Sequence, residues 1–249
     1  MISKAQIKFI NSLGQKKYRK QHQLFIAETH KIISELFKSH YKIHSIFATK
    51  EWVHENKTLL ERISPSETTT ISPRELQKIS QLNTPNQVLA LVHVPPTKNK
   101  GISDITLMLD AIRDPGNIGT ILRIADWFGI GQVTCSEDCV DVYNPKAVQS
   151  SMGSIFRVNV HYSNLVDTIK GNPHVNFYAS ALEGKPLRKT IWKMPVGIII
   201  GNESHGISRG IMELVGTKTT IEKNGQAESL NAATATSIIL YQALANIQD

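Results

Sequence analysis

Three polar segments of the chain carry the side chains best suited to chemistry, and each follows an apolar run. They cover residues 114–123, 200–208 and 221–233. In parallel α/β sheets, ligands bind outside the carboxyl ends of the strands, so segments that follow strands are where a site is expected. Arg123 in the first segment offers a planar guanidinium that suits a phosphate or a planar polar group. A structural ion pair with Asp126 is the alternative role for this arginine.

The second segment excludes two enzyme classes that its glycines suggest. Gly201 and Gly206 have the spacing of a phosphate loop, but an Ile-Ser pair stands where that loop needs Lys followed by Ser or Thr. The five residues centred on Ser208 fit the G-x-S-x-G turn of serine hydrolases. That fold needs a histidine later in the chain, and none follows His205. His205 is the histidine expected nearest to a site in this segment.

The third segment leads into a helix rich in small residues, which the sequence predicts at 232–247. Ser229 or Asn231 can cap this helix, because either side chain accepts hydrogen bonds from free backbone N–H groups. A helix N-terminus of this kind binds an anion such as a carboxylate. When the segment is considered alone, an ordinary cap on a packed helix is the alternative.

The runs between these segments indicate the elements that position them. Short apolar runs predict strands at 105–109, 132–135, 157–161, 176–179 and 196–200. Helical stretches separate the runs, so the pattern predicts an α/β fold with a mainly parallel sheet covered on both faces. The helix after the first strand carries Arg123, and we expect Trp127 and Phe128 to anchor that helix in the core.

The first part of the chain is basic and is predicted to be a separate domain. Residues 1–98 hold 15 Lys and Arg against 7 Asp and Glu, whereas residues 99–249 hold 13 against 14. A basic excess confined to one part is typical of a module that binds a polyanion, with a solubilising surface as the alternative. A stretch rich in Pro, Lys and Gly predicts a small α/β domain at 1–95, a linker at 96–102 and a second α/β domain at 103–249.

Local signals predict the elements of this basic part. Ser3 is placed to cap a helix at 4–13, and the Ser72-Pro73-Arg74-Glu75 run is the start signal of another helix. The run 15–20 is a basic segment with one aromatic residue. Apolar runs predict strands at 25–27, 43–48 and 87–94.

Length and composition exclude several other classes. The 249-residue chain is 41% apolar, enough to bury a core, and no apolar run reaches the roughly 18 residues of a membrane helix. The first residues lack the apolar region of a secretory signal, and two cysteines imply no disulfide framework. Cys135 and Cys139 have no second Cys or His pair at zinc spacing. These observations predict a cytoplasmic protein without a metal site.

Taken together, the order and spacing of the three segments resemble the three motifs of the SpoU/TrmH branch of the SPOUT RNA methyltransferases. The resemblance covers about residues 103–247. The residues that carry it are 117–123, 200–203 with Gly206, and 228–231 with the small-residue helix after them, together with the intervening runs 145–148 and 151–158.

The resemblance implies a fold and an assembly that residue patterns alone do not. Members of this family have a deep trefoil knot in the C-terminal chain that forms the cofactor site. They are typically homodimers whose active sites take groups from both subunits. The N-terminal part resembles the family's substrate-binding domain, with Phe25-Ile26-Ala27-Glu28-Thr29 where the family has Phe-x-x-Glu-Gly. The expected partner is a structured RNA, either rRNA or tRNA.

The reaction implied by the resemblance is methyl transfer from S-adenosylmethionine to a ribose 2′-hydroxyl. Catalytic Arg123 would lie against the target nucleotide and act by phosphate clamping and electrostatics, because a guanidinium with a pKa above about 12 is a poor base. By resemblance, the groups that orient the reaction around it are Asn117, Glu203, Ser229 and Asn231. Backbone groups near Ser180, Gly201, Ile221 and Leu230 would hold the cofactor. No metal is required.

Two other classes stay open at this point. A non-catalytic RNA-binding protein fits the basic N-terminal part, and binding of S-adenosylmethionine would separate it from the enzyme. A Rossmann-type dehydrogenase or methyltransferase fits the α/β pattern, but no G-x-G-x-x-G follows an early strand. A nicotinamide-binding measurement would test the dehydrogenase.

Overall fold

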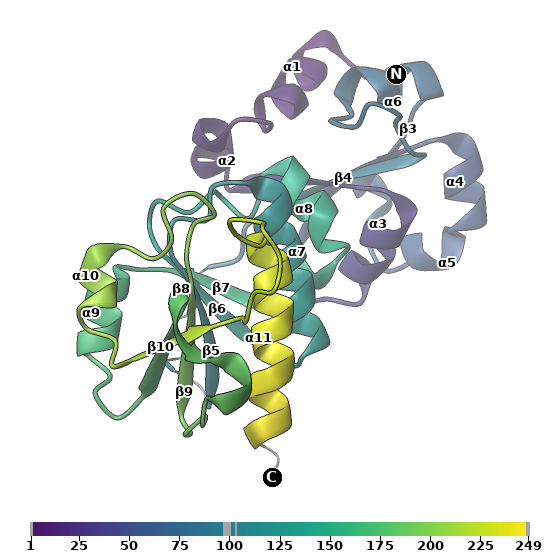
Figure 1. Ribbon diagram of the computed structural model, residues 1–249. Helices are drawn as coiled ribbons and strands as arrows, with labels where there is room; N and C mark the ends of the chain where they lie inside the picture. Colours follow the sequence, from purple (N-terminus) through teal and green to yellow (C-terminus); the bar gives the residue numbers. More distant parts are fainter. Residues whose placement is uncertain (1, 97–100, 103, 248–249) are drawn as a thin grey trace. The chain divides into compact units, whose positions relative to one another are not determined.

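The computed structural model describes residues 2–96, 101–102 and 104–247, so residues 97–100 of the expected linker lie outside the described part. The chain forms two compact units (Figure 1). One contains Met1–Pro96 and Asp141–Arg157, and the other contains Thr97–Val140 and Val158–Asp249. Residues 141–157, which the sequence analysis assigns to the second domain, pack with the first unit.

The first unit is built on a mixed four-stranded sheet. The strand order is β1-β4-β2-β3, with β4 antiparallel to both β1 and β2, and β3 parallel to β2. The predicted strands at 25–27, 43–48 and 87–94 are confirmed, with both end points shifted by one residue in the first and the third. The strands are β1 Leu24–Glu28, β2 Ile43–Ala48, β3 Thr68–Thr70 and β4 Val88–His93.

Helices surround this sheet, and the predicted caps hold two of them. Ser3 and Ser72 each form a capping box with the residue three positions later, so two free N–H groups are satisfied at each helix start. The helices are α1 Lys4–Ser12, α2 Lys16–His22, α3 His30–Phe37, α4 Lys50–Glu55, α5 Lys57–Leu60, α6 Pro73–Ile79 and α8 Pro145–Ser151, with short 3-10 turns η1 Pro65–Glu67 and η2 Ser154–Phe156.

A buried ion pair and a group of aromatic rings hold residues 141–157 in the first unit. Arg19 is 3% exposed, and its Nη2 lies 2.6 Å from Oδ2 of Asp141. Its Nη1 donates to the carbonyls of Leu13 and Gly14, so the guanidinium is well satisfied. The ring of Phe25 lies 4.7 Å from that of Tyr143 and 6.5 Å from that of Phe156. Arg19 therefore has a structural role and is not a free cation of the basic run.

The junction between β1 and α3 has an unusual backbone. Thr29 has φ 83° and ψ 145°, a region that β-branched residues rarely enter. Its hydroxyl accepts from the N–H of Ile32 and caps α3. The carboxylate of Glu28, one residue earlier, accepts from the Ser80 hydroxyl and the Gln81 N–H. Thr29 thus takes a conformation for which the related motif has glycine.

The second unit is built on a six-stranded sheet in which each neighbouring pair of strands is parallel. The strand order is β10-β8-β9-β5-β6-β7. This confirms the predicted α/β class, although β7 begins two residues later than expected, β8 is longer, and β10 was not predicted. The strands are β5 Ile105–Leu109, β6 Gln132–Cys135, β7 Asn159–Tyr162, β8 Asn176–Pro186, β9 Val196–Ile200 and β10 Thr217–Thr220.

In the described part of this unit, four helices and one 3-10 turn accompany the sheet. They are α7 Pro115–Trp127, α9 Leu165–Lys170, α10 Arg209–Met212, α11 Ala232–Ile247 and η3 Leu187–Lys189. Helix α11 packs against α7 (Figure 1). The expectation that Trp127 anchors α7 in the core is wrong, because its side chain is 84% exposed. Buried Ile118, Ile121 and Leu122 attach the helix instead.

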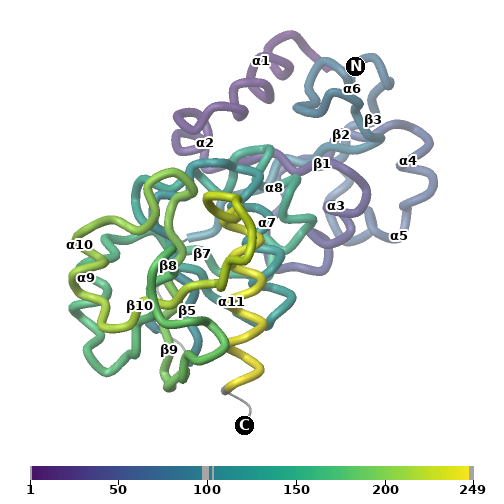
Figure 2. Tube along the Cα trace, in the orientation of Figure 1, coloured from purple at the N-terminus to yellow at the C-terminus, as the bar shows by residue number. Residues whose placement is uncertain are grey.

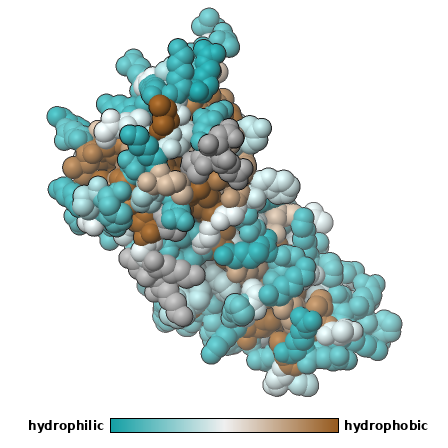
Figure 3. All heavy atoms as spheres, turned by 90° about the horizontal axis from the view of Figure 1, so that it is seen from below, coloured by the Kyte–Doolittle hydropathy of each residue, from teal (hydrophilic) through white to brown (hydrophobic). Residues whose placement is uncertain are grey.

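Apolar groups reach the surface between polar ones on the face shown in Figure 3. Within the described part of the chain, no helix has the length and apolar character needed to cross a lipid bilayer.

Candidate active site

A cavity of about 640 Å³ lies in the second unit, where the ends of β8, β9 and β10 meet the start of α11. Parallel strands place their carboxyl ends at one edge of the sheet, and the polar segments that follow them meet there. Figure 2 shows the chain leaving β10, passing through the loop at 221–231 and entering α11. Both this loop and the loop at 201–207 line the cavity.

The loop after β9 is a tight turn fixed by its own backbone. Asn202 and Gly206 exchange two backbone hydrogen bonds of 3.0 and 2.9 Å. A Cβ on Gly201 would lie 2.3 Å from the carbonyl carbon of Gly206, so only glycine fits at this position. The Asn202 side chain donates to the Ala111 carbonyl, and the Asp110 carboxylate accepts from the Ser208 N–H. The turn is therefore tied to the end of β5.

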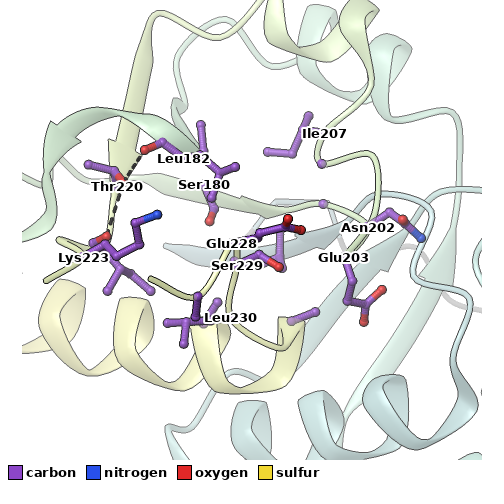
Figure 4. Close-up of a pocket in the computed structure, with 18 of the residues that line it drawn as sticks. Ser180, Leu182, Asn202, Glu203, Ile207, Thr220, Lys223, Glu228, Ser229 and Leu230 are labelled. Carbon is purple, nitrogen blue, oxygen red and sulfur yellow. Dashed lines mark hydrogen bonds between the residues drawn. The ribbon is translucent and has the colours of Figure 1, made fainter. Parts of the chain in front are cut away.

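The wall formed by β8 arises from a break in strand pairing. Lys218 of β10 pairs with Ala179, whereas the next residue, Thr219, pairs with Lys185. Residues 180–184 therefore leave the ladder. Gly184 permits this path, because a Cβ there would lie 2.7 Å from the Lys218 carbonyl oxygen. The displaced segment contributes Ser180 and Leu182 to the cavity (Figure 4).

A chain of side-chain hydrogen bonds joins one residue from each of the three segments. The Asn117 amide donates to Oε1 of Glu203. Asn231 donates to Oδ1 of Asn117 over 2.8 Å. The other end of the Asn231 amide accepts from the N–H groups of Ala233 and Thr234 and so caps α11. Of the two expected caps, Asn231 is the one used, and the chain fixes the three segments relative to one another.

Six of the nine predicted site residues line the cavity: Ser180, Gly201, Glu203, Ile221, Ser229 and Leu230. Asn117 and Asn231 do not line it but are joined to Glu203 by the hydrogen bonds above. Figure 4 shows Glu228 and Ser229 between Ser180 and Glu203.

Arg123 lies apart from the cavity lining, on the exposed face of α7. Among the described residues it forms no ion pair with Asp126 or any other carboxylate. The structural ion pair considered from sequence is therefore not formed in this unit. Arg123 shares a helix face with Thr120 and Trp127, since these positions are spaced by three and four residues.

Lys223 and Leu182 are among the lining residues that were not singled out from the sequence. Glu228, which belongs to the third motif of the family resemblance, also lines the cavity. His205 also lines it, as expected for the second segment. Glu222 pairs with Arg188 over 2.8 Å, whereas Glu228 has neither an ion pair nor a side-chain hydrogen bond to the described residues. Lys223 and Leu182 each lie two residues after a predicted cofactor-binding residue, Ile221 and Ser180, and this closeness in sequence was the available signal.

Comparison with known proteins gives two matches along the chain. Residues 104–241 match the model of the SpoU rRNA Methylase family, and residues 4–90 match the MRM3-like substrate binding domain. The chain is 31% identical over 245 residues to the 23S rRNA (guanosine(2553)-2'-O)-methyltransferase RlmP of Bacillus subtilis, with 94% of each chain covered.

Two further similarities extend this comparison. A 23S rRNA (uridine(2479)-2'-O)-methyltransferase of Streptomyces viridochromogenes is 29% identical over 78% of this chain and 71% of that protein. The structure of the SpoU methyltransferase AviRb from the same organism, in complex with AdoMet, has a TM-score of 0.87 and 25% identity over 99% of both chains. The model that matches residues 104–241 covers more than half of the chain. With its second and third motif segments lining one cavity and the first joined to them through Asn117, this protein belongs to the SpoU rRNA methylase family.

Proposed function

We propose that this protein transfers the methyl group of S-adenosylmethionine to a ribose 2′-hydroxyl of ribosomal RNA. The observation that carries the proposal is the cavity in which the second and third motif segments meet, with the first motif joined to it through Asn117. Family membership supports the reaction, and the rRNA named for the Bacillus and Streptomyces relatives supports the substrate class.

The cavity lining fits S-adenosylmethionine. Leu182 and Leu230 are exposed apolar side chains on the cavity wall, and a bound adenine would cover them. Backbone groups near Ser180, Gly201, Ile221 and Leu230 would hold the cofactor. The cofactor supplies an electrophilic methyl group on a positively charged sulfur. The unpaired carboxylate of Glu228 would favour a cationic ligand in this cavity.

We assign the remaining site residues to positioning. Asn117, Glu203 and Asn231 form one hydrogen-bonded chain, so each fixes the orientation of its neighbour. Ser229 lies in the cavity beside Glu228, where its hydroxyl can contact the reacting ribose (Figure 4). Arg123 would clamp a phosphate of the target nucleotide and stabilise charge as the hydroxyl loses its proton.

The exposed position of Arg123 leads us to propose a homodimer. Trp127 on α7 and Ile238 and Tyr241 on α11 are exposed, and their helices pack side by side. Large apolar side chains that gather on one surface mark an interaction site. A second copy of the chain covering them would bring Arg123 to the interface, where it would serve the partner's cavity.

The division into domains and the knot are proposed from family membership. We propose residues 1–95 as the RNA-binding domain and 103–249 as the methyltransferase domain, with residues 141–157 packed in the first unit and a trefoil knot in the C-terminal part. We also propose a cytoplasmic location, for which the free, buried thiols of Cys135 and Cys139 suit a reducing compartment.

Two measurements test the function. Calorimetry on the full chain should detect S-adenosylmethionine binding with one site per chain, and a nicotinamide cofactor should not bind. Mapping of 2′-O-methyl groups in total RNA, with and without the gene, should show one rRNA position that depends on it. Cofactor binding without any gene-dependent methylated position would reject the proposed reaction, and absence of cofactor binding would favour a non-catalytic RNA-binding protein.

A further inference from the structure

The first unit contains a second cavity that the proposed reaction does not use. It has a volume of about 300 Å³ and is lined by the end of β1, the loop after α6 and helix α8. All three elements belong to the same compact unit. Its size is at the small end of ligand pockets, which suits one planar ring system better than a large cofactor.

The carboxylate of Glu28 lies in the wall of this cavity and is 5% exposed. Oε2 accepts from the Ser80 hydroxyl at 2.5 Å, and Oε1 accepts from the Gln81 N–H at 2.8 Å. Each carboxylate oxygen has two acceptor sites, so each can take one more donor. A buried carboxylate with both oxygens fixed is a rigid acceptor for a ligand that carries two adjacent donors.

The rest of the lining combines apolar and amide groups with the side chains of Lys146 and Ser150. The apolar lining comes from half-buried Leu82 and from Ile26 and Val148, which are each 1% exposed. Asn83 and Gln149 bring side-chain amides that make no hydrogen bond to any described residue. An amide offers both donors and an acceptor, so these two residues can read the edge of a base.

We propose that this cavity binds one unpaired guanine base of the substrate RNA. Guanine presents the adjacent N1–H and N2–H donors on its Watson–Crick edge, and these match the two oxygens of Glu28. Uracil presents a single N–H between two carbonyl oxygens, which the carboxylate would repel. Proteins read RNA sequence mainly from unpaired bases in this way. The choice of RNA as ligand rests on the proposed function.

The proposal also gives a role to residues 145–150. They lie within the sequence matched by the methyltransferase family model, yet they form one wall of a cavity whose other walls come from the N-terminal residues. Recognition of the base would therefore use both parts of the sequence inside one compact unit.

Nucleotide titration of the full chain tests the site without relying on catalysis. S-adenosylhomocysteine is kept at a saturating concentration so that nucleotides do not enter the cofactor cavity, and GMP, IMP and UMP are titrated by NMR. GMP should bind at millimolar concentration. IMP lacks the N2 amino group and should bind at least about tenfold more weakly than GMP, because one hydrogen bond to a charged group is lost. UMP should not bind detectably.

Two variants with matched controls assign the binding to this cavity. Glu28→Gln should abolish the preference for GMP over IMP, whereas Glu51→Gln, on an exposed part of α4, should not. Asn83→Ala changes an exposed loop residue and should weaken GMP binding several-fold without altering thermal unfolding. Asn86→Ala, in the same loop but outside the cavity, is its control.

Methylation of rRNA by the same variants separates this proposal from the proposed function. Asn83→Ala should raise KM for rRNA and leave kcat unchanged. Active enzyme that binds GMP, IMP and UMP equally, or not at all, would overturn the guanine site and leave the methyltransferase intact. Selective GMP binding by a protein without methyltransferase activity would overturn the proposed function instead.

Discussion

The strained backbone at Thr29 gives a prediction in which removing a side chain makes the protein more stable. Thr29 adopts φ 83° and ψ 145°, close to a region that only glycine enters freely. A residue held in such a region costs about 1–3 kcal/mol. Thr29→Gly removes the Cβ that causes this cost.

Two losses oppose this gain. The Thr29 hydroxyl caps α3 through the Ile32 N–H at 3.4 Å, and replacing such a cap by glycine costs only a few tenths of a kcal/mol. Glycine also makes the unfolded chain more flexible, which costs about 0.4–1 kcal/mol. The net expectation is a gain of about 1 kcal/mol in the free energy of unfolding, or a rise of about 2–4 °C in Tm.

Thr29→Ala is the matched control, because it keeps the Cβ and removes the capping hydroxyl together with the γ-methyl group. Its free energy of unfolding should fall by about 1 kcal/mol. Thermal unfolding of the full chain measures both variants, and hydrogen exchange of the β1 and α3 amides shows that the change is local. If glycine lowers Tm as much as alanine does, strain at Thr29 is absent and the reasoning fails.

The other predictions concern catalysis, assembly and stability. Arg123→Ala should slow single-turnover methyl transfer by about 10²–10³-fold with cofactor affinity unchanged, and Arg123→Lys should rescue little of it; a near-normal rate would remove its catalytic role. Trp127→Asp should shift the chain from dimer to monomer in sedimentation, and an unchanged dimer would place the interface elsewhere. Asp141→Ala should lower the urea-derived free energy of unfolding by about 3 kcal/mol or more, because it leaves the Arg19 guanidinium buried without its partner, and a loss below about 1 kcal/mol would contradict this. Hydrogen bonds from the Ser72 N–H and hydroxyl and the Ile2 N–H lower the pKa of Glu75 from 4.5 to about 2, so the stability advantage over Glu75→Gln should be complete above pH 4.5, shrink as the pH falls and vanish below about 2; an advantage independent of pH would refute it.

Elements with strong local signals were predictable from the sequence. The capping boxes at Ser3 and Ser72 and the apolar strands at 105–109 and 196–200 lie where expected, because local residues alone determine them. Strand β10 was missed because it is a polar edge strand, in which only Thr219 is buried. Its place depends on pairing with β8, whose partner residues lie 34 or 39 positions earlier in the chain.

The residues of the candidate site were also predictable only in part. The motif residues that line the cavity were found because their spacing resembles a known family. The hydrogen-bonded chain from Glu203 through Asn117 to Asn231 joins residues more than 80 positions apart, and spacing alone cannot specify such contacts. Trp127 was assigned to the core because large apolar residues are usually buried, whereas its side chain is 84% exposed.

The inclusion of residues 141–157 in the first unit limits how this protein can be taken apart or recombined. The chain passes between the units after residue 96, after residue 140 and after residue 157. A truncation that removes only the N-terminal residues would leave Val148, Ile155 and Phe156 without the partners that bury them. A chimera that borrows an N-terminal region from a relative would therefore need that relative's 141–157 segment as well, so that two separate stretches of sequence are exchanged as one module.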